Sequence, residues 1–287
     1  MARLNALGLM QADGVTPLSL AELYKAVIEN VSKTAVSVAF KNKNQSGNVA
    51  AGTVEYKRFA DSAAVAYGTA RAAGKGKILK IAPVVVTLNV DREIVEEIEE
   101  KDILTSGIPN MMNRQALAHI KAFKRDLDTA FWKEAYATGV KATIAAATTA
   151  GKIEELILAV EDVSNAYVDG VDRDMLGLCL TTKLHSALRL EIDELPVDSI
   201  ALAQGAIGQY HGVPVWVSNH LPKGALQVVD AFCMFMGSVA QPLNVTKQYA
   251  DEKIPLSNAH AIELFYSYGT EATMPDLIAY IGDLYVA

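Results

Sequence analysis

One long amphipathic helix is predicted near the middle of the chain, in the segment NRQALAHIKAFKRDLDTAFWKEAYATG, residues 113–139. About two dozen residues at 1.5 Å each make a rod of roughly 36 Å, about twice the length of an average helix. Gly139 is placed to end it, and Lys121, Arg125 and Asp128 fall towards a polar face. The apolar residues share another face: Ala116, Ile120, Phe123, Leu127 and Phe131.

An extended excursion is predicted between residues 53 and 90. Residues 53–59, TVEYKRF, alternate as a strand does, and residues 77–90, KILKIAPVVVTLNV, are rich in β-branched residues and predict a second strand. Legs of this kind reach roughly 25 to 45 Å at ~3.3 Å per residue. A two-stranded ribbon is marginally stable alone in water, so it packs on its own subunit or on a neighbour. The small, cationic tip favours a neighbour.

The tip, GTARAAGKGK at residues 68–77, has some features of a phosphate-binding loop. A P-loop places four residues between its glycines and ends in Gly-Lys-Ser/Thr, but five residues separate Gly68 from Gly74, and Gly76 stands in place of the hydroxyl. A P-loop also opens a helix, whereas the residues after this tip predict a strand. A flexible hairpin tip is therefore favoured over a nucleotide site.

Two shorter helices are predicted on either side of this excursion. Residues 16–32, TPLSLAELYKAVIENVS, begin a helix at Ser19 with one apolar stripe, and the polar stretch at 41–52 makes this helix part of an arm that needs a partner surface. Residues 91–102, DREIVEEIEEKD, predict a short acidic helix. Its buried side would carry Ile94, Val95 and Ile98, and its glutamates are interpreted as a solvated face in preference to catalytic carboxylates.

The second half of the sequence alternates helical and strand patterns, which predicts a compact mixed α/β domain without repeats. Helices are expected at residues 152–168 and 183–192. Strands are expected at residues 175–182, 213–219 and 226–237, and near 244–250 and 261–269, where the last two return to the sheet beside the long helix.

Composition limits the classes of function. The 26 basic and 33 acidic residues give a formal net charge of -7, so the chain repels a phosphate backbone and sequence-specific DNA binding is not expected. Cys179 and Cys233 lie in apolar strand-like runs, where cysteine acts as a small buried hydrophobe, and they favour a reducing, cytoplasmic setting. No apolar run approaches the ~18 residues of a membrane span, and the N-terminus is a poor signal peptide.

Signatures of catalysis are missing from the sequence. It contains no GxSxG, HExxH, CxxC or GxGxxG pattern, so we expect no enzyme, no catalytic residue, no cofactor and no metal. The five histidines are dispersed, and His119 has no second ligand at metal spacing. The carboxylates of residues 169–174, DGVDRD, lack the ligand order of an EF-hand, so a plain turn is favoured over a calcium site.

The order of these elements resembles the major capsid proteins of tailed bacteriophages with the Hong Kong 97-type fold. Residues 128–139 are similar to the end of the family's spine helix, and residues 259–281 to its closing strands. The most specific local match is YHGVPVWVSNHLPKG, residues 210–224, which is similar to the family's G-x-PV-x-x-S…P-x-G strand and turn. It is carried here by Gly212, Pro214, Val215, Ser218, Pro222 and Gly224. The resemblance covers nearly the whole chain.

The resemblance implies an α+β fold in four parts. Residues 1–52 would form an N-terminal arm and residues 53–90 an extended β-hairpin loop that overlaps adjacent subunits. Residues 91–151 and 240–275 would form a peripheral domain with the long spine helix. Residues 152–239 and 276–287 would form an α/β axial domain around which pentamers and hexamers gather.

The resemblance also implies a function: a structural protein that self-assembles into an icosahedral shell around double-stranded phage DNA. Such a protein would belong to the virion and assemble in the host bacterial cytoplasm. The candidate contact residues between subunits are Arg71, Lys75 and Lys77, which would meet acidic surface on a neighbour.

The same resemblance implies further partners. Because the chain has room only for a short arm, a separate scaffolding protein is expected, together with a portal, and DNA would be enclosed without sequence-specific binding. By position, Lys75 or Lys77 corresponds to the lysine that the founding member joins to asparagine, but no motif identifies the other partners, so cross-linking is not expected.

Two alternatives remain open. The first is an encapsulin, a bacterial compartment of the same fold that encloses enzymes in place of DNA. The second is a metabolic α/β enzyme with its site in the second domain. Closed shells in electron micrographs would support a container, and small discrete oligomers with turnover would support the enzyme.

Overall fold

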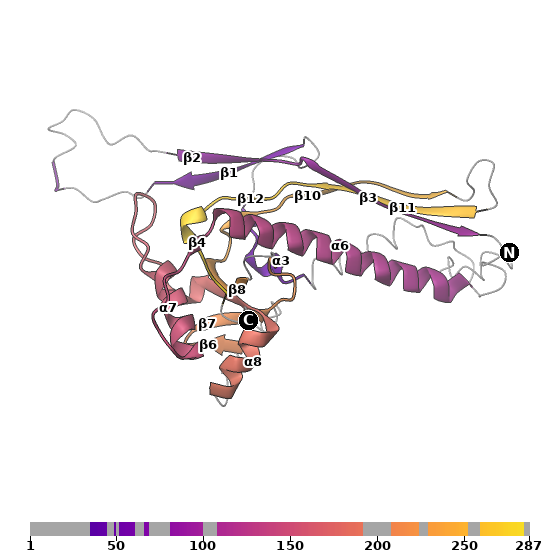
Figure 1. Ribbon diagram of the computed structural model, residues 1–287. Coiled ribbons are helices and arrows are strands. Elements are labelled where there is room, and N and C mark those ends of the chain that lie inside the picture. Colours follow the sequence, from indigo (N-terminus) through magenta and orange to yellow (C-terminus); the bar gives the residue numbers. More distant parts are fainter. Residues whose placement is uncertain are drawn as a thin grey trace, which may run out of the picture.

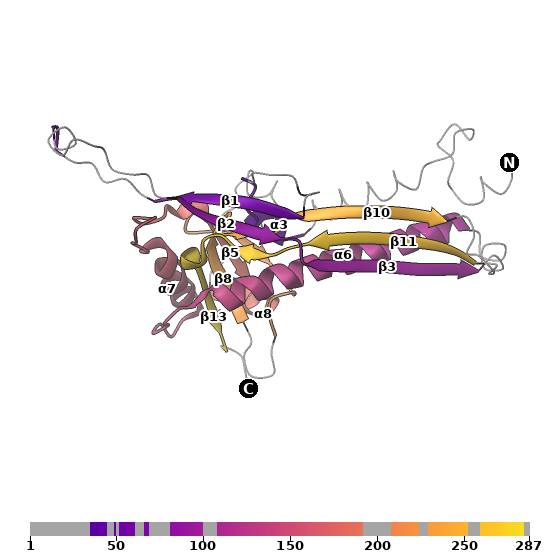
Figure 2. The ribbon, with the colours of Figure 1, turned by 90° about the horizontal axis from the view of Figure 1, so that it is seen from above.

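The computed structural model has an elongated part and a compact part that meet along one long helix (Figure 1). In the elongated part α6 (Ile108–Thr138) lies beneath three long strands, and in the compact part a sheet packs with shorter helices. A two-stranded hairpin extends from the junction in the direction opposite to the long strands (Figure 2). The structure describes residues 35–44, 49, 52–60, 66–68, 81–99, 108–191, 208–223, 229–251 and 259–283.

The long helix predicted from the sequence is confirmed. It spans 31 residues, or about 46 Å, and begins at Ile108, earlier than the pattern indicated. On its predicted apolar face Phe123, Leu127 and Phe131 are buried. Gly139 follows its end, where a Cβ would lie only 2.8 Å from a side-chain carbon of Ile278. Glycine therefore lets the end of α6 pack directly on the neighbouring strand.

Three antiparallel strands lie along α6 in the order β10-β11-β3. Their bounds are β3 (Val90–Glu99), β10 (Leu243–Asp251) and β11 (Ala259–Tyr268). One cluster joins Phe123 and Leu127 of the helix to Leu264, Tyr266 and Tyr268 of β11. The prediction that the last strands return to the sheet beside the long helix is confirmed.

The prediction of a short helix at residues 91–102 is wrong, because residues 90–99 form β3. This strand pairs with β11 over ten residues, from Val90 to Glu99. Glutamates favour a helix locally, but continuous cross-strand pairing and packing outweigh so weak a propensity. Ile94 packs towards α6, as a period of two requires, while Val95, expected to be buried, is 44% exposed.

The compact part contains a six-stranded sheet in the order β4-β13-β8-β5-β7-β6. One face packs on α7 (Thr149–Glu161) and α8 (Thr182–Glu191), and the other packs on α6. In β8, Ala231 and Cys233 belong to the first cluster, and Phe232 and Met234 to the second. A strand covered on both faces reads as a continuous apolar run. The strands are β4 (Val140–Lys141), β5 (Leu176–Leu180), β6 (Gly208–Tyr210), β7 (Val213–Val217), β8 (Val229–Phe235) and β13 (Ile278–Gly282).

Short elements connect these layers: α3 (Ser37–Phe40), η2 (Arg173–Met175), β9 (Val239–Ala240), β12 (Glu271–Ala272) and η3 (Pro275–Leu277). The helices and strands predicted for the second half are confirmed in type and order, with bounds that differ by several residues. The helix predicted to begin at Ser19 lies outside the described residues.

The predicted extended hairpin is confirmed in its two legs. β1 (Thr53–Phe59) pairs with β2 (Ile81–Thr87) in antiparallel register, from Thr53 opposite Thr87 to Phe59 opposite Ile81. One face of its base is buried on the same subunit, where Val54, Tyr56 and Val86 cluster with Ala240. A Cβ at position 269 would lie 2.1 Å from the carbonyl oxygen of Thr87, so Gly269 permits this close approach.

Candidate assembly surfaces

The far end of β1 is tied to the compact part by Arg58. Its two terminal nitrogens donate hydrogen bonds to the two carboxylate oxygens of Asp276, at 2.6 and 2.7 Å. Such a two-bond fork fixes orientation as well as distance. The side chains are only 13% and 26% exposed, so solvent and salt screen the pair less than a fully exposed one.

Two further residues complete this contact. Asn165 donates from Nδ2 to Asp276 at 2.6 Å, and its Oδ1 accepts from the backbone N–H groups of Tyr167 and Val168. This turn holds the ring of Tyr167 4.8 Å from Cζ of Arg58, within the range of a cation–π contact. We call Arg58, Asp276, Asn165 and Tyr167 the loop bracket.

Asp276 is ionised at neutral pH. Burial acts to raise the pKa of Asp276, but hydrogen bonds from Arg58 and Asn165 outweigh burial, so its pKa lies below the ordinary value of 3.8. A carboxyl group whose pKa is lowered by folding stabilises the folded state above its unfolded pKa and loses that contribution as pH falls through the folded pKa. The bracket therefore holds across the neutral range.

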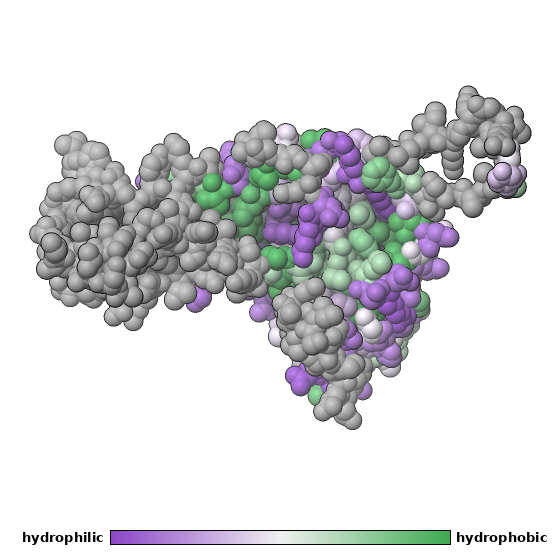
Figure 3. Space-filling model, turned by 180° about the vertical axis from the view of Figure 1, so that it is seen from behind, coloured by the Kyte–Doolittle hydropathy of each residue, from purple (hydrophilic) through white to green (hydrophobic). Residues whose placement is uncertain are grey.

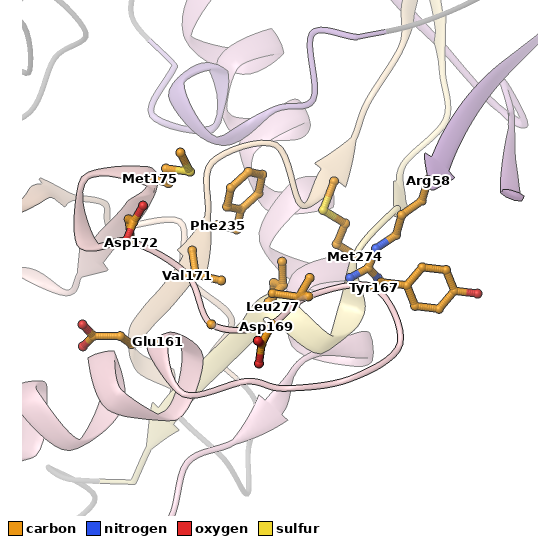
Figure 4. Close-up of a pocket in the computed structure, with 12 residues that line it drawn as sticks. Arg58, Glu161, Tyr167, Asp169, Val171, Asp172, Met175, Phe235, Met274 and Leu277 are labelled. Carbon is orange, nitrogen blue, oxygen red and sulfur yellow. The ribbon is translucent and has the colours of Figure 1, made fainter. Parts of the chain in front are cut away.

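An open surface groove of about 610 Å³ lies beside the loop bracket (Figure 4). Its aliphatic and aromatic lining includes Val168, Val171, Met175, Phe235, Met274 and Leu277, and its acidic lining comprises Glu161, Asp169 and Asp172. Arg173 binds Glu161 and Glu154 at 3.0 and 2.6 Å, so this carboxylate pair is engaged. Within the described residues, no three His, Cys, Asp or Glu side chains converge in a way that suits a metal ion.

One face of β3 is strongly acidic. Glu96 points to the other side, where it pairs with the buried His119 of α6 at 2.9 Å, and strand alternation places the odd-numbered residues on the outer face. Glu263 of β11 stands opposite Val95 and shares that face. We call five residues the acidic face: Asp91, Glu93, Glu97, Glu99 and Glu263.

Carboxylates outnumber cations on this face, where the strand register also places Lys247 of β10, opposite Phe265. The four carboxylates on β3 are exposed, and Glu263 is half-buried. A row of like charges on one sheet face raises the local negative potential and attracts a cationic partner.

A short N-terminal segment is seated between the two parts of the subunit. Phe40, at the end of α3, is fully buried and packs edge-on against Trp132 of α6 and Trp216 of β7, with ring centroids 5.4 and 4.8 Å apart. Gly177 of β5 makes room for it, since a Cβ there would lie 2.4 Å from the ring. Phe40 thus joins this segment to both α6 and the six-stranded sheet.

The side of α6 that carries Asp128 is covered, because α3 and the loop after β7 pack over it. Asp128 is fully buried and accepts hydrogen bonds from the backbone N–H and hydroxyl of Ser37, while its second oxygen lies 3.2 Å from Nδ1 of His220. The hydroxyl bonds the carboxylate and not the imidazole, so these three residues lack the serine–histidine contact of a nucleophilic triad. Nearby, burial lowers the pKa of Lys41 to about 8, and attraction to Asp128 offsets only part of this.

The contact residues predicted at the tip, Arg71, Lys75 and Lys77, lie outside the described residues. Just before them, Tyr67 is 99% exposed, and Gly68 has a φ of 92°, a left-handed conformation that suits glycine. No helix in the described part of the chain has the length and apolar character needed to cross a membrane.

The two cysteines, Cys179 and Cys233, are buried and unpaired, as predicted, and burial raises the pKa of both thiols. Exposed apolar side chains occur singly on several elements, among them Leu190 of α8 and Val85 of β2. Seen from behind, the described surface mixes apolar and hydrophilic residues (Figure 3). Such scattered residues are common on proteins and define no interface by themselves.

The loop bracket was not predicted from the sequence, although one signal was present. In TVEYKRF the apolar side of the alternation runs through Val54 and Tyr56 to Arg58, which places a cation on the buried side of a strand. A buried cation requires a partner. That partner, Asp276, is 218 residues away, and no local pattern singles it out.

No family model and no curated protein matches the sequence. Several solved structures match the fold. The capsid of a native GTA particle gives a TM-score of 0.60 at 13% identity, covering 87% of this chain and 90% of that chain. The capsid of Ralstonia phage GP4 gives 0.58 at 11% identity, covering 86% and 87%. A virus-like particle from Pyrococcus furiosus gives 0.54 at 12% identity, covering 91% and 98%.

At sequence identities of 11–13%, these matches show that the fold is shared and nothing more. The long helix, the strands that lie along it, the hairpin and the compact mixed sheet together make the α+β Hong Kong 97-type fold that the order of elements led us to expect.

Proposed function

We propose that this chain is a structural shell subunit, the major capsid protein of a tailed bacteriophage, and that many copies assemble into a closed icosahedral shell around double-stranded DNA. The observation that carries this proposal is the fold, which extends over 86% of the chain in common with the capsid of Ralstonia phage GP4. Rings of five and six copies would form around the axial domain, residues 152–239 and 276–287, and the long helix would belong to the peripheral domain.

Contact between copies would involve the extended loop. The tip residues Arg71, Lys75 and Lys77 carry three positive charges, and the acidic face on β3 and β11 offers five carboxylates. We assign the acidic face as the surface that receives the tip of an adjacent copy. Each exposed ion pair contributes only about 0.2–1 kcal/mol, so these contacts would fix register more than affinity.

The charge of the chain fits a container for DNA. A net charge of -7 disfavours tight binding to phosphates, which would leave the genome free to slide during packaging. A separate scaffolding protein and a portal would be the other partners, and the mature protein would belong to the virion. A strongly basic inner surface of the shell would contradict this reading of the charge.

The second candidate is a compartment that encloses protein cargo. The likeness to the Pyrococcus furiosus virus-like particle, which covers nearly all of that chain, supports this alternative, although with a lower TM-score than the phage capsids reported above. The contents of the particles distinguish the two, since DNA identifies a capsid and a protein cargo identifies a compartment.

Electron microscopy of the purified 287-residue chain tests the proposal. We expect rings of five or six copies, or closed shells, at high protein concentration. Small discrete oligomers with a measurable catalytic turnover would contradict the proposal and support a metabolic enzyme.

A further inference from the structure

The hairpin is held to the body of its own subunit at two places. The first is the apolar cluster at its base, where Val54, Tyr56 and Val86 pack on Ala240. The second is the loop bracket, where Arg58 binds Asp276 at 2.6 and 2.7 Å. Two separated attachments define a direction, whereas one attachment leaves a two-stranded ribbon free to pivot.

The second attachment is built to resist rotation. A guanidinium fork on a carboxylate is planar and pairs both oxygens, so turning the strand breaks at least one bond. Asn165 also donates to Oδ2 of Asp276 at 2.6 Å, and the ring of Tyr167 lies 4.8 Å from the guanidinium carbon. Asp276 also sits in η3, directly before the buried Leu277 and β13, so the acceptor belongs to the six-stranded sheet.

The lengths involved amplify any change at Arg58. Val54 and Phe59 are five residues apart, or about 17 Å along an extended strand. A swing of about 10° around the base would move Phe59 by about 3 Å, which is close to the rise of one residue along a strand. Any atom farther from the base moves by more.

We propose that Arg58 is a positioning residue: its fork on Asp276 fixes the direction in which the extended loop leaves the subunit, and thereby the angle at which adjacent copies join. The consequence for shells rests on the proposed function. The direction of the loop is a property of one copy and does not rest on it.

The first test measures that direction in unassembled protomers. Spin labels are attached to cysteines introduced at Phe59 and Leu190, which are 55% and 86% exposed, while the native Cys179 and Cys233 are fully buried. We expect a narrow distance distribution in the otherwise wild-type chain and a distribution at least about twice as wide with Arg58→Ala. Arg58→Lys, which keeps the charge but loses the fork, should widen it as well.

The control for this test is Lys57→Ala, which removes a neighbouring cation on the opposite, exposed side of β1, and it should leave the distribution unchanged. Should Arg58→Ala not fold, Arg58→Lys decides. A distance distribution that stays as narrow in the folded Arg58 variant as in the wild type would overturn the positioning role. An equal widening in Lys57→Ala would overturn it as well.

The second test compares particles formed by the same variants in electron micrographs. We expect shells of one diameter from the wild type and from Lys57→Ala, and few or variably sized shells from Arg58→Ala. Wild-type diameters and yields from Arg58→Ala would overturn the link between loop direction and shell geometry. If the wild type itself forms neither rings nor shells, the proposed function fails, while the distance measurement still decides the role of Arg58.

Discussion

The contact between Phe40 and Gly177 allows a quantitative test of how the N-terminal segment is held. Replacing a fully buried phenylalanine by alanine typically costs about 3–5 kcal/mol, and Phe40 is 0% exposed between two tryptophan rings. Gly177→Ala would place a methyl group 2.4 Å from the ring, and such overpacking costs about 1–3 kcal/mol. When Phe40 is already alanine, the clash is absent. Gly177→Ala should therefore cost at least about 1 kcal/mol less in the Phe40→Ala background than in the wild type.

Urea unfolding followed by tryptophan fluorescence measures this cycle. Trp132 and Trp216 are the only two tryptophans in the sequence, and both contact Phe40, so the signal reports on this site. We expect a clear coupling between the two substitutions. Additive free energies, or a loss below about 1 kcal/mol for Phe40→Ala, would refute the proposal that this residue is the anchor of the segment.

Three further predictions follow from the same structure. Deleting residues 68–77 should leave folded protomers by circular dichroism but abolish stable shells in micrographs, and normal particles would show that the tip is dispensable. Glu93→Lys with Glu97→Lys should lower the yield of pelletable particles, and Lys75→Glu with Lys77→Glu should restore it; no loss of yield would remove the acidic face from assembly. Lys41→Met should raise the urea midpoint of unfolding at pH 7, because the folded chain releases the lysine proton near pH 8 and the unfolded chain near 10.5. Wild-type stability therefore rises with pH between these two values, and the difference in midpoint between the variant and the wild type should shrink over the same range. A difference that stays constant with pH would contradict the prediction.

Strong local patterns made much of the fold predictable. The long helix follows from an apolar stripe repeated over several turns, and the strands of the second half follow from apolar runs bounded by turn residues. The segment at 91–102 could not be assigned in the same way, since its glutamates satisfy a helical period as well as an alternating one. The choice was made by β11, which is more than 150 residues away in sequence and supplies the ten pairing partners.

The contacts between parts of the subunit were less predictable, because each joins residues far apart in the chain. The cationic tip led us to expect an acidic partner surface, but the acidic face that we propose for that role could not be located, since it required β3 to be a strand. Asp128 looked like a polar surface residue until α3, 91 residues earlier, was seen to bury it. The partner of Arg58 was hidden for the same reason.

Carbodiimide cross-linking of assembled particles, made from a mixture of nitrogen-15 labelled and unlabelled copies, tests the central claim most directly. The reagent joins lysine to carboxylate only where the two touch, and mass differences separate links within one copy from links between copies. We expect links from Lys75 or Lys77 of one copy to Glu93, Glu97 or Glu99 of another. Particles whose tip lysines link only within their own copy, or to no residue of the acidic face, would contradict the account.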